Sequence, residues 1–390
     1  MIDTARVREE FPLAREWCYL ATASDGILPE RSRRWLADYF AGSGYLEVSP
    51  VYARYFEDLA ALRERAGRVL GGRARNWSLQ PNTSYGLNTV AAAVPWRTGD
   101  NVVLADREFP ANVQPWRNLA ARGVEARRVP APDHRARAEN LLAACDARTR
   151  LVTVSGVGFL TGYATDLAAL AAGCRERGIW LCVDGIQGLG NRDWDLPALG
   201  VDFLAAGGQK WLCAPRGAGL LWVSDRALAA LDAGELVPGL RGWLDMRRWN
   251  VEDLLDYDQP VTRGARRLEI GTYAWHDFMC LGHSLALLEE LGPADVAAHS
   301  DRLRERFLEG LAARGLAAPA GPYAAPAADD PPGRRSQVVG LRCPDASGLR
   351  QRLLERRVVA SAREGHLRVA FHHYNDEDDV DRLLEGLAAD

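Results

Sequence analysis

Short apolar runs alternate with amphipathic stretches between about residue 76 and residue 225. Continuous apolar runs of four to eight residues are typical of buried strands, and apolar residues recurring every three or four positions are typical of helices. Strands separated by helices favour a mainly parallel sheet that is covered on both faces. The pattern predicts strands at 101–106, 150–157, 179–185, 201–208 and 217–223, and helices at 111–123 and 166–178.

The C-terminal part of the chain has a different pattern. Amphipathic helices are predicted at 274–292 and 301–315, and a loop rich in proline and alanine at 316–335. A small α+β unit follows, with strands at 336–343 and 367–374 and helices at 348–357 and 375–390. We therefore expect a large domain over residues 15–255. We expect a small domain over residues 256–390 that also includes residues 1–14.

Composition indicates a soluble globular protein. The 390 residues are 47% hydrophobic and 26% charged, with a net charge of −4 and no basic block that would suit a nucleic acid or a membrane surface. Seven scattered cysteines without a CxxC pair predict reduced thiols in the cytoplasm. The charged N-terminus is unlike a signal peptide, and no apolar run is long enough to cross a bilayer.

Lys210, in "FLAAGGQKWL", is the only lysine among 48 basic residues. A coding bias would replace lysine by arginine wherever only charge is needed, so a retained lysine points to the chemistry of a primary amine. Lys210 follows an apolar strand and two glycines, and open α/β sheets bind ligands at such strand ends. Burial there lowers an amine's pKa, and an amine, unlike a guanidinium, forms a Schiff base. The alternative is a lysine on a surface loop.

Asp184, in "VDGIQ", lies 26 residues earlier at the end of another apolar strand. A buried carboxylate is costly unless it is paired, and a protonated pyridine nitrogen is one suitable partner. A strand-end aspartate followed by a lysine on a later strand end is the arrangement that pyridoxal phosphate (PLP) needs, because the lysine holds the aldehyde and the aspartate keeps the ring protonated. The alternative for Asp184 alone is a helix cap.

The stretch 183–223, from "VDGIQ" through "GGQKWL" to "LLWV", resembles the class V aminotransferase and cysteine desulfurase group of fold-type I PLP enzymes. The resemblance implies a large domain with a seven-stranded, mainly parallel sheet and a small α+β C-terminal domain. It also implies PLP as cofactor, an amino acid as substrate, and a homodimer with shared active sites.

The resemblance assigns further residues to the cofactor and the substrate. "PNTSYGLN" looks like the phosphate-binding turn, where hydroxyls and N–H groups at a helix start form an anion site. "REFPANVQPW" looks like the segment that carries the side chain stacked on the ring, which places Phe109 there. The alternatives are a plain helix cap for the first stretch and a core aromatic for Phe109. The implied cofactor residues are Asn82, Thr83, Ser84, Phe109, Asp184, Gln187, Gln209, Lys210 and, reaching the neighbouring subunit, Thr272.

Arg368, in "HLRVAFHHYN", is implied as the bidentate clamp for the substrate's α-carboxylate. The alternative is an arginine in a surface salt bridge. Lys210 and Asp184 are the implied catalytic pair, with Lys210 as the base that removes the α-proton.

Departures from the group's pattern narrow the predicted reaction. Phe109 stands where cysteine desulfurases have a histidine, and no cysteine lies between Cys343 and the C-terminus to receive sulfur. Gly156 and Gly207 replace an asparagine and a serine. We therefore predict a β-eliminating C–S lyase acting on a cysteine-derived conjugate. The alternatives are an aminotransferase, an epimerase and a decarboxylating variant, and a cysteine desulfurase is less favoured. The alternative that is not an enzyme is a PLP-fold protein that binds a partner or ligand without turnover.

Three other stretches carry no predicted site. "GIQGLG" is GxxGxG rather than the dinucleotide-binding GxGxxG. His372 and His373 are adjacent on a predicted strand, where neighbours face opposite sides, so no metal site is predicted. The cluster 241–250, with two tryptophans and three arginines, predicts a solvated loop, with a lid over a large polar substrate as the alternative.

Overall fold

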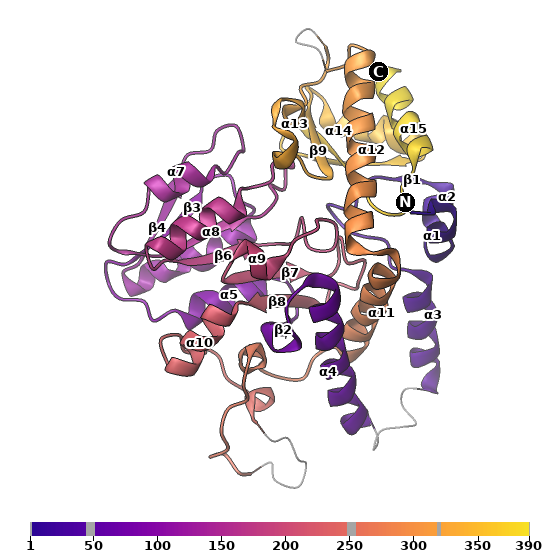
Figure 1. Ribbon diagram of the computed structural model, residues 1–390. Coiled ribbons are helices and arrows are strands. Elements are labelled where there is room, and N and C mark those ends of the chain that lie inside the picture. Colours follow the sequence, from indigo (N-terminus) through magenta and orange to yellow (C-terminus); the bar gives the residue numbers. More distant parts are fainter. Residues whose placement is uncertain (1, 44–50, 248–254, 318–320, 390) are drawn as a thin grey trace.

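A seven-stranded sheet forms the centre of the computed structural model, which describes residues 2–43, 51–247, 255–317 and 321–389 (Figure 1). The strand order is β2-β8-β7-β6-β5-β3-β4. Neighbouring strands are parallel except at β7–β8 and β2–β8. The prediction of a mainly parallel sheet is confirmed. The strands are β2 (Trp77–Gln80), β3 (Asn101–Ala105), β4 (Glu125–Val129), β5 (Thr149–Ser155), β6 (Trp180–Asp184), β7 (Phe203–Gly207) and β8 (Gly219–Val223).

Helices cover both faces of this sheet, because its inner strands are buried on both sides, whereas the edge strand β4 is only partly buried. On β6, Leu181 and Val183 belong to one core cluster while Cys182 between them belongs to the other. The helices of the large sheet region are α4 (Val51–Leu70), α5 (Thr83–Ala93), α6 (Gln114–Asn118), α7 (Ala138–Ala143), α8 (Leu167–Glu176), α9 (Leu196–Leu199), α10 (Asp225–Ala233) and α11 (Trp275–Leu291).

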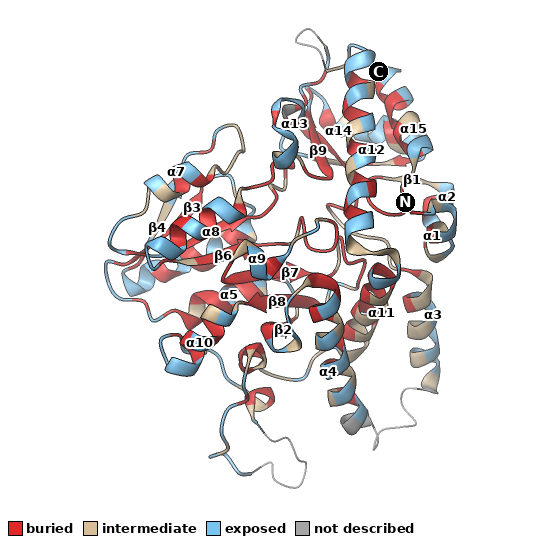
Figure 2. Ribbon diagram, in the orientation of Figure 1, coloured by how far each residue is buried: buried red, intermediate tan, exposed pale blue. Residues whose placement is uncertain are grey.

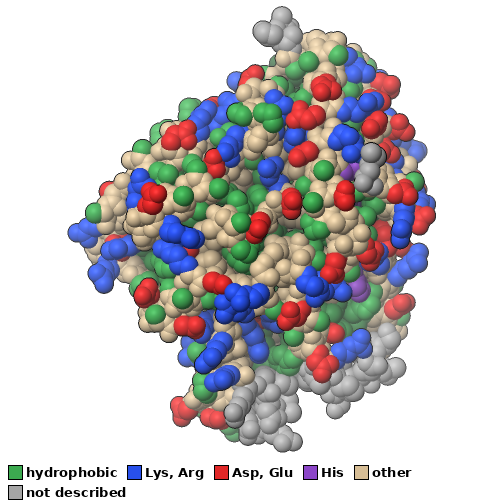
Figure 3. All heavy atoms as spheres, viewed as in Figure 1, with side chains coloured by type: hydrophobic (Ala, Val, Ile, Leu, Met, Phe, Trp, Pro, Cys, Tyr) green, Lys and Arg blue, Asp and Glu red, His purple; other side chains and the backbone are tan. Residues whose placement is uncertain are grey.

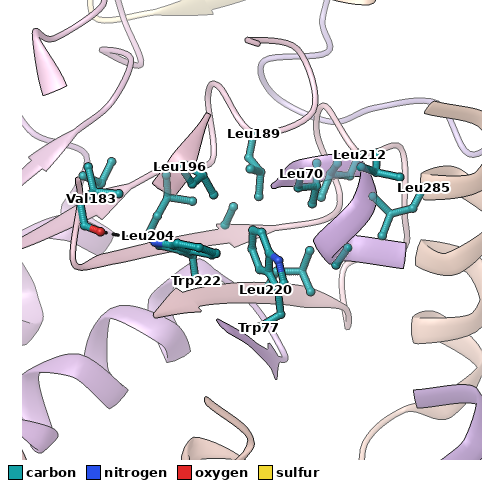
Figure 4. Close-up of a cluster of buried hydrophobic side chains, with 14 of the residues drawn as sticks. Leu70, Trp77, Val183, Leu189, Leu196, Leu204, Leu212, Leu220, Trp222 and Leu285 are labelled. Carbon is teal, nitrogen blue, oxygen red and sulfur yellow. Dashed lines mark hydrogen bonds between the residues drawn. The ribbon is translucent and has the colours of Figure 1, made fainter. Parts of the chain in front are cut away.

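The largest core cluster fixes the strand that precedes Lys210. Figure 4 shows Leu204 of β7 with Leu220 and Trp222 of β8 and with Trp77 of β2. The rings of Trp77 and Trp222 meet edge to face at 5.4 Å. The buried layer continues through the strands in Figure 2, so the end of β7 is held by close packing.

The predicted helix at 111–123 is wrong as a single element. The segment is divided into a 3-10 turn (Pro110–Asn112), α6 and a second 3-10 turn (Leu119–Arg122). Pro115 explains the break, because proline has no N–H to donate in a continuous helix and occupies the first turn of α6. The segment ends as predicted at Gly123, which has φ 73°.

A three-stranded antiparallel sheet forms the C-terminal unit, in the order β11-β12-β9. The predicted α+β pattern is confirmed there. Its strands are β9 (Val338–Arg342), β11 (Ser361–Arg363) and β12 (His366–Ala370), and its helices are α12 (Pro293–Ala313), α13 (Pro326–Asp329), α14 (Ala346–Glu355) and α15 (Glu377–Ala388). Helix α13 lies within the stretch 316–335 for which only a loop was predicted, and residues 318–320 of that stretch lie outside the described residues.

The N-terminal segment packs against this C-terminal unit (Figure 1). Strand β1 (Cys18–Tyr19) pairs in parallel with β10 (Val358–Val359), and Arg8 forms ion pairs with Asp376 and Asp379. The N-terminal helices are α1 (Thr4–Glu10), α2 (Leu13–Glu16) and α3 (Glu30–Asp38). A domain division at residue 255, with residues 1–14 joining the small domain, stays a proposal.

Charge is spread over the outside of the molecule. Arginine and acidic side chains are interspersed over the face in Figure 3, and no helix in the described part of the chain is both long and apolar enough to span a membrane. Within the cluster 241–250, Trp243–Asp245 forms a 3-10 turn and residues 248–250 lie outside the described residues.

Candidate active site

A cavity of about 290 Å³ lies where the strand ends of the large sheet meet β11 and β12 of the small one. It collects most of the residues predicted from the sequence. The predicted residues that line it are Asn82, Thr83, Ser84, Phe109, Asp184, Gln187, Gln209, Lys210 and Arg368. Thr272 is exposed and does not line this cavity, so its predicted role in a neighbouring subunit stays a prediction.

Lys210 lies in the turn after β7, whose packing delivers it to the cavity. Burial lowers the pKa of its amine to about 8; Asp184 opposes the shift, and nearby Arg368 and Arg363 contribute to it. Its Nζ atom lies 5.9 Å from the centre of the Phe109 ring. A substantial fraction of this amine is therefore neutral near pH 8, as a nucleophile or base requires.

Asp184 ends β6 and is 2% exposed. Burial raises the pKa of its carboxyl to about 6. Two effects oppose this rise: the N–H of Ile186, which donates to Oδ1 at 3.1 Å, and the charge of Lys210. In the described part of the chain Asp184 has no ion pair within 4.0 Å. A buried carboxylate that lines a cavity without a cation at contact distance is suited to a protonated ring nitrogen.

Glu108 anchors the segment that carries Phe109, and the sequence analysis missed this. Its carboxylate accepts from the backbone N–H of Ser155 at 2.9 Å, from the Ser155 hydroxyl, and from Asn112 at 3.1 Å. Burial raises the pKa of Glu108 to about 7. The Phe109 ring is 41% exposed and meets Phe159 edge to face at 5.4 Å, so an apolar surface of the cavity is open to a planar ligand.

The start of α5 forms a second polar wall. Asn82 caps the helix by accepting from the N–H of Tyr85 at 2.9 Å, and the hydroxyl of Thr83 accepts from the N–H of Gly207 at 2.8 Å. Gly86 allows the helix to lie against β7, because a Cβ there would come within 2.9 Å of Ala205. An eleven-residue helix thus directs its N-terminus and the side chain of Ser84 at the cavity, which suits a phosphate.

Two glutamines complete the cofactor side of the cavity. Gln187 donates through Nε2 to the carbonyl of Ala23 at 3.0 Å and accepts at Oε1 from the indole N–H of Trp211 at 3.1 Å. The second hydrogen on its Nε2 remains for a ring hydroxyl. Gln209 has a buried Oε1 without a hydrogen-bond partner. A bound group that supplies a partner for Gln209 would satisfy this amide.

Arg368, on β12, is 2% exposed and has no carboxylate partner within 4.0 Å among the described residues. It donates to the carbonyl of Phe159 at 2.6 Å, to the hydroxyl of Ser24 at 2.6 Å and to that of Ser361 at 3.2 Å. Burial, followed by the charge of Arg363, lowers the pKa of its guanidinium to about 9. A carboxylate ligand would compensate this charge.

The N-terminal segment 23–26, which was not predicted as part of the site, also lines or supports the cavity. Ser24 bonds Arg368, and Asp25 pairs with Arg216 at 2.7 Å. Gly26 lies so close to the Lys210 turn that a Cβ would come within 2.1 Å of the Lys210 carbonyl oxygen. The only local signal was the turn-like sequence "ASDG", which does not reveal a partner 184 residues away.

The expectation that His372 and His373 face opposite sides is wrong. Their ring centres are 3.9 Å apart, because β12 ends at Ala370 and both residues lie in the turn beyond it. Their ring nitrogens and the thiol of Cys213 lie within 4.8 Å of one another in a buried cluster. His372 donates from Nε2 to the Trp211 carbonyl at 3.0 Å. That no metal binds stays a prediction.

The cavity therefore fits PLP by the chemistry of its donors. Lys210 would hold the aldehyde, Asp184 the ring nitrogen, Phe109 the ring face, and the start of α5 the phosphate. The orphaned oxygen of Gln209 and the carboxylate of Asp184, which has no ion pair within 4.0 Å among the described residues, are the observations that this fit would resolve.

Comparisons with known proteins agree with this geometry. The family model described as aminotransferase class-V matches residues 40–329. The chain is 30% identical to isopenicillin N epimerase of Streptomyces clavuligerus, covering 95% of this chain and 94% of that protein. It is 29% identical to a probable cysteine desulfurase of Methanothermobacter thermautotrophicus, covering 78% and 74%.

A solved structure of a C-DES variant, with glycine covalently linked to its PLP cofactor, is 25% identical and has a TM-score of 0.84 over 98% of both chains. C-DES in complex with cysteine persulfide, described as a cystine C–S lyase, has a TM-score of 0.83 at 24% identity over 97% of this chain and 99% of that one. The fold-type I architecture predicted from the sequence is confirmed by these likenesses.

Proposed function

The chain belongs to the aminotransferase class-V family, and from that premise we propose that it is a β-eliminating C–S lyase acting on a cysteine-derived conjugate. Members of this family are PLP-dependent enzymes that act on amino acids, and this chain is one of them. The proposal rests on the positions of the cysteine thiols relative to the cavity. All seven cysteines lie within the described residues, and none lines the cavity.

A desulfurase that keeps sulfur on the enzyme needs a thiolate at the site to receive it. Cys213 is the cysteine nearest to Lys210 in sequence, but it is 3% exposed, and burial raises its pKa far above the range in which a thiolate forms. Sulfur therefore leaves this cavity as part of a free thiol. C-DES, a structural neighbour, is a cystine C–S lyase, which supports this choice.

The side chains divide the work of such a reaction. Arg368 binds the α-carboxylate and orients the substrate, and Lys210, with a pKa of about 8, removes the α-proton at Nζ. When bound, PLP delocalises the electron pair left on the α-carbon, and Asp184 supports this by holding the ring nitrogen protonated. Phe109 and Phe159 give that side of the cavity an apolar wall.

The overall reaction balances with one water. The bond between Cβ and sulfur breaks, sulfur leaves with the electron pair and takes up a proton, and the remaining three carbons become pyruvate with release of ammonium. Neither a thiol acceptor nor an external oxidant is required. Lys210 supplies the proton transfers at the α-carbon, and the cavity needs no second base for elimination.

Epimerisation is the second candidate, because the chain is 30% identical to isopenicillin N epimerase over 95% of its length. Inversion requires a proton to return to the face of the α-carbon opposite Lys210. Asp25 is the remaining acid among the described residues that line the cavity, and Arg216 holds it at 2.7 Å. Elimination is favoured because it requires no proton donor on the face opposite Lys210.

The test incubates the PLP-loaded enzyme with a panel of S-alkyl cysteines and measures pyruvate and free thiol, with Lys210→Ala as the inactive control. Equal amounts of pyruvate and thiol are expected. Alanine with enzyme-bound sulfur would instead identify a desulfurase, and loss of optical activity without pyruvate would identify an epimerase. Absence of pyruvate from every conjugate would overturn the proposal.

A further inference from the structure

Arg363 is a second arginine in the cavity that the proposed chemistry does not use. It ends β11, lines the cavity with Arg368, and its side chain is exposed at the rim. Among the described residues, its side chain makes one hydrogen bond, a weak one from Nη2 to the hydroxyl of Ser24 at 3.4 Å. This single contact leaves most of its guanidinium donors available to a ligand.

The two guanidinium groups lie close together. Arg368 donates from Nη2 to the same Ser24 oxygen at 2.6 Å, so the two terminal nitrogens are no more than about 6 Å apart. The charge of Arg363 lowers the pKa of both Arg368 and Lys210. This end of the cavity therefore holds like charges at short range, an arrangement that costs free energy until an anion enters.

The acids of the cavity do not compensate these charges. Among the described residues, its acidic side chains are Asp25 and Asp184. Asp25 is paired with Arg216 at 2.7 Å, and Asp184 is placed for the cofactor ring at the end of β6. Neither Arg363 nor Arg368 has a carboxylate within 4.0 Å in the described part of the chain. Two guanidiniums without acids suit two anionic groups on one ligand.

We propose that Arg363 forms a second anion subsite, and that the substrate is a cysteine conjugate whose sulfur substituent ends in a carboxylate. This inference rests on the proposed function. Arg368 binds the α-carboxylate, and Arg363 binds the distal carboxylate within reach of a substituent two or three atoms long, given a separation of at most about 6 Å. The α-amine of the substrate is then directed at Lys210, which lines the same cavity.

The competing interpretation is that Arg363 is a solvated arginine near the tip of the hairpin between β11 and β12. In that case its removal would change turnover of every substrate by the same small factor, or not at all. A subsite makes a different demand, because removal of Arg363 would weaken only those substrates that carry the distal charge.

The kinetic test compares S-(2-carboxyethyl)cysteine with the uncharged amide of the same shape, S-(2-carbamoylethyl)cysteine. We expect the wild-type enzyme to prefer the acid about tenfold or more in kcat/KM. Arg363→Gln should lower kcat/KM for the acid about 10- to 100-fold and change that for the amide less than threefold. Arg350→Gln, an exposed arginine on α14, is the matched control and should leave both values unchanged.

A binding test is independent of turnover. Glutarate, which carries two carboxylates, and butyrate, which carries one, are titrated calorimetrically into the PLP-loaded enzyme. Glutarate should bind at least tenfold more tightly than butyrate, and Arg363→Gln should remove this difference. This result would support the subsite even if no conjugate is cleaved, so its failure can be told apart from failure of the C–S lyase proposal. Equal effects of Arg363→Gln on acid and amide, and equal binding of the two acids, would overturn it.

Discussion

The two sheets supply the cavity with charge in opposite ways. The large sheet brings Asp184 and Lys210, a buried acid and a buried amine, each of which moves the pKa of the other toward its charged form. The small sheet brings Arg363 and Arg368, two cations that oppose each other. The acid–amine pair is partly compensated before any ligand arrives, whereas the pair of arginines is compensated only by an anion. The first arrangement suits a permanently held cofactor and the second suits an exchanging substrate.

The largest expected effect comes from changing the chemistry of Lys210 while its charge is kept. Lys210→Arg should lower turnover by about 10³-fold or more, because a guanidinium neither forms a Schiff base nor acts as a base near neutral pH. Pyruvate release and the visible absorbance of the protein measure this. Unchanged thermal unfolding would show that the fold is intact, and an arginine variant with a tenth of the activity would refute the role assigned to Lys210.

On the substrate side, the expected effect is smaller and depends on geometry. Arg368→Lys keeps the charge but loses the planar fork that bonds Phe159, Ser24 and a carboxylate. We expect kcat/KM to fall about 100-fold for acidic and neutral conjugates alike. A loss confined to acidic conjugates would mean that the roles of Arg363 and Arg368 are reversed.

Gly26 lies against the turn that carries Lys210, and its segment also carries Ser24, which bonds Arg368 of the small sheet. Replacement of Gly26 should therefore have a moderate effect on stability and on turnover. A Cβ at this position would meet the Lys210 carbonyl oxygen at 2.1 Å, so Gly26→Ala must displace either the Lys210 turn or the segment carrying Ser24. We expect a loss of about 1–3 kcal/mol in the free energy of unfolding and roughly tenfold in kcat/KM. Gly333→Ala is the control, since a Cβ there meets nothing within 4 Å. Similar values for both variants would show that the contact is unimportant.

The smallest expected effect is a shift in pH dependence. Burial lowers the pKa of Lys210, so its charged form is disfavoured and the neutral amine predominates above pH 8. The rate at which the apoprotein takes up PLP, followed by absorbance, should therefore rise with pH through a midpoint near 8. Because Arg363 lowers this pKa, Arg363→Gln should move the midpoint to higher pH by a fraction of a unit. An unchanged or lower midpoint would contradict the electrostatic coupling of the two regions.

The cofactor half of the site could be predicted because its signals are local. Asp184 and Lys210 each follow an apolar strand, and the ends of neighbouring parallel strands meet at one edge of the sheet. The helix start at Asn82 was likewise visible in sequence as a cap before an apolar stretch. These predicted positions all line the cavity, although their functional roles stay predictions.

The residues that were missed owe their positions to long-range contacts. Ser24 meets Arg368 across 344 residues of chain, and Glu108 bonds Ser155 across 47. The wrong expectation for His372 and His373 has a similar cause, because alternation of side chains holds only within a strand and β12 ends two residues earlier. Strand ends are the least certain feature of a sequence pattern.

The sequence by itself determined the fold class, because periodicity specifies alternating strands and helices, and it predicted the chemistry of a primary amine at Lys210, because arginine cannot form a Schiff base. Only the tertiary structure decided which charges share the cavity and which of them remain uncompensated. Electrostatic interactions depend on distance and burial, which packing sets among residues far apart in the chain. The closeness of the buried Arg368 to Arg363 at the rim, from which we propose an anionic substrate, follows from that packing alone.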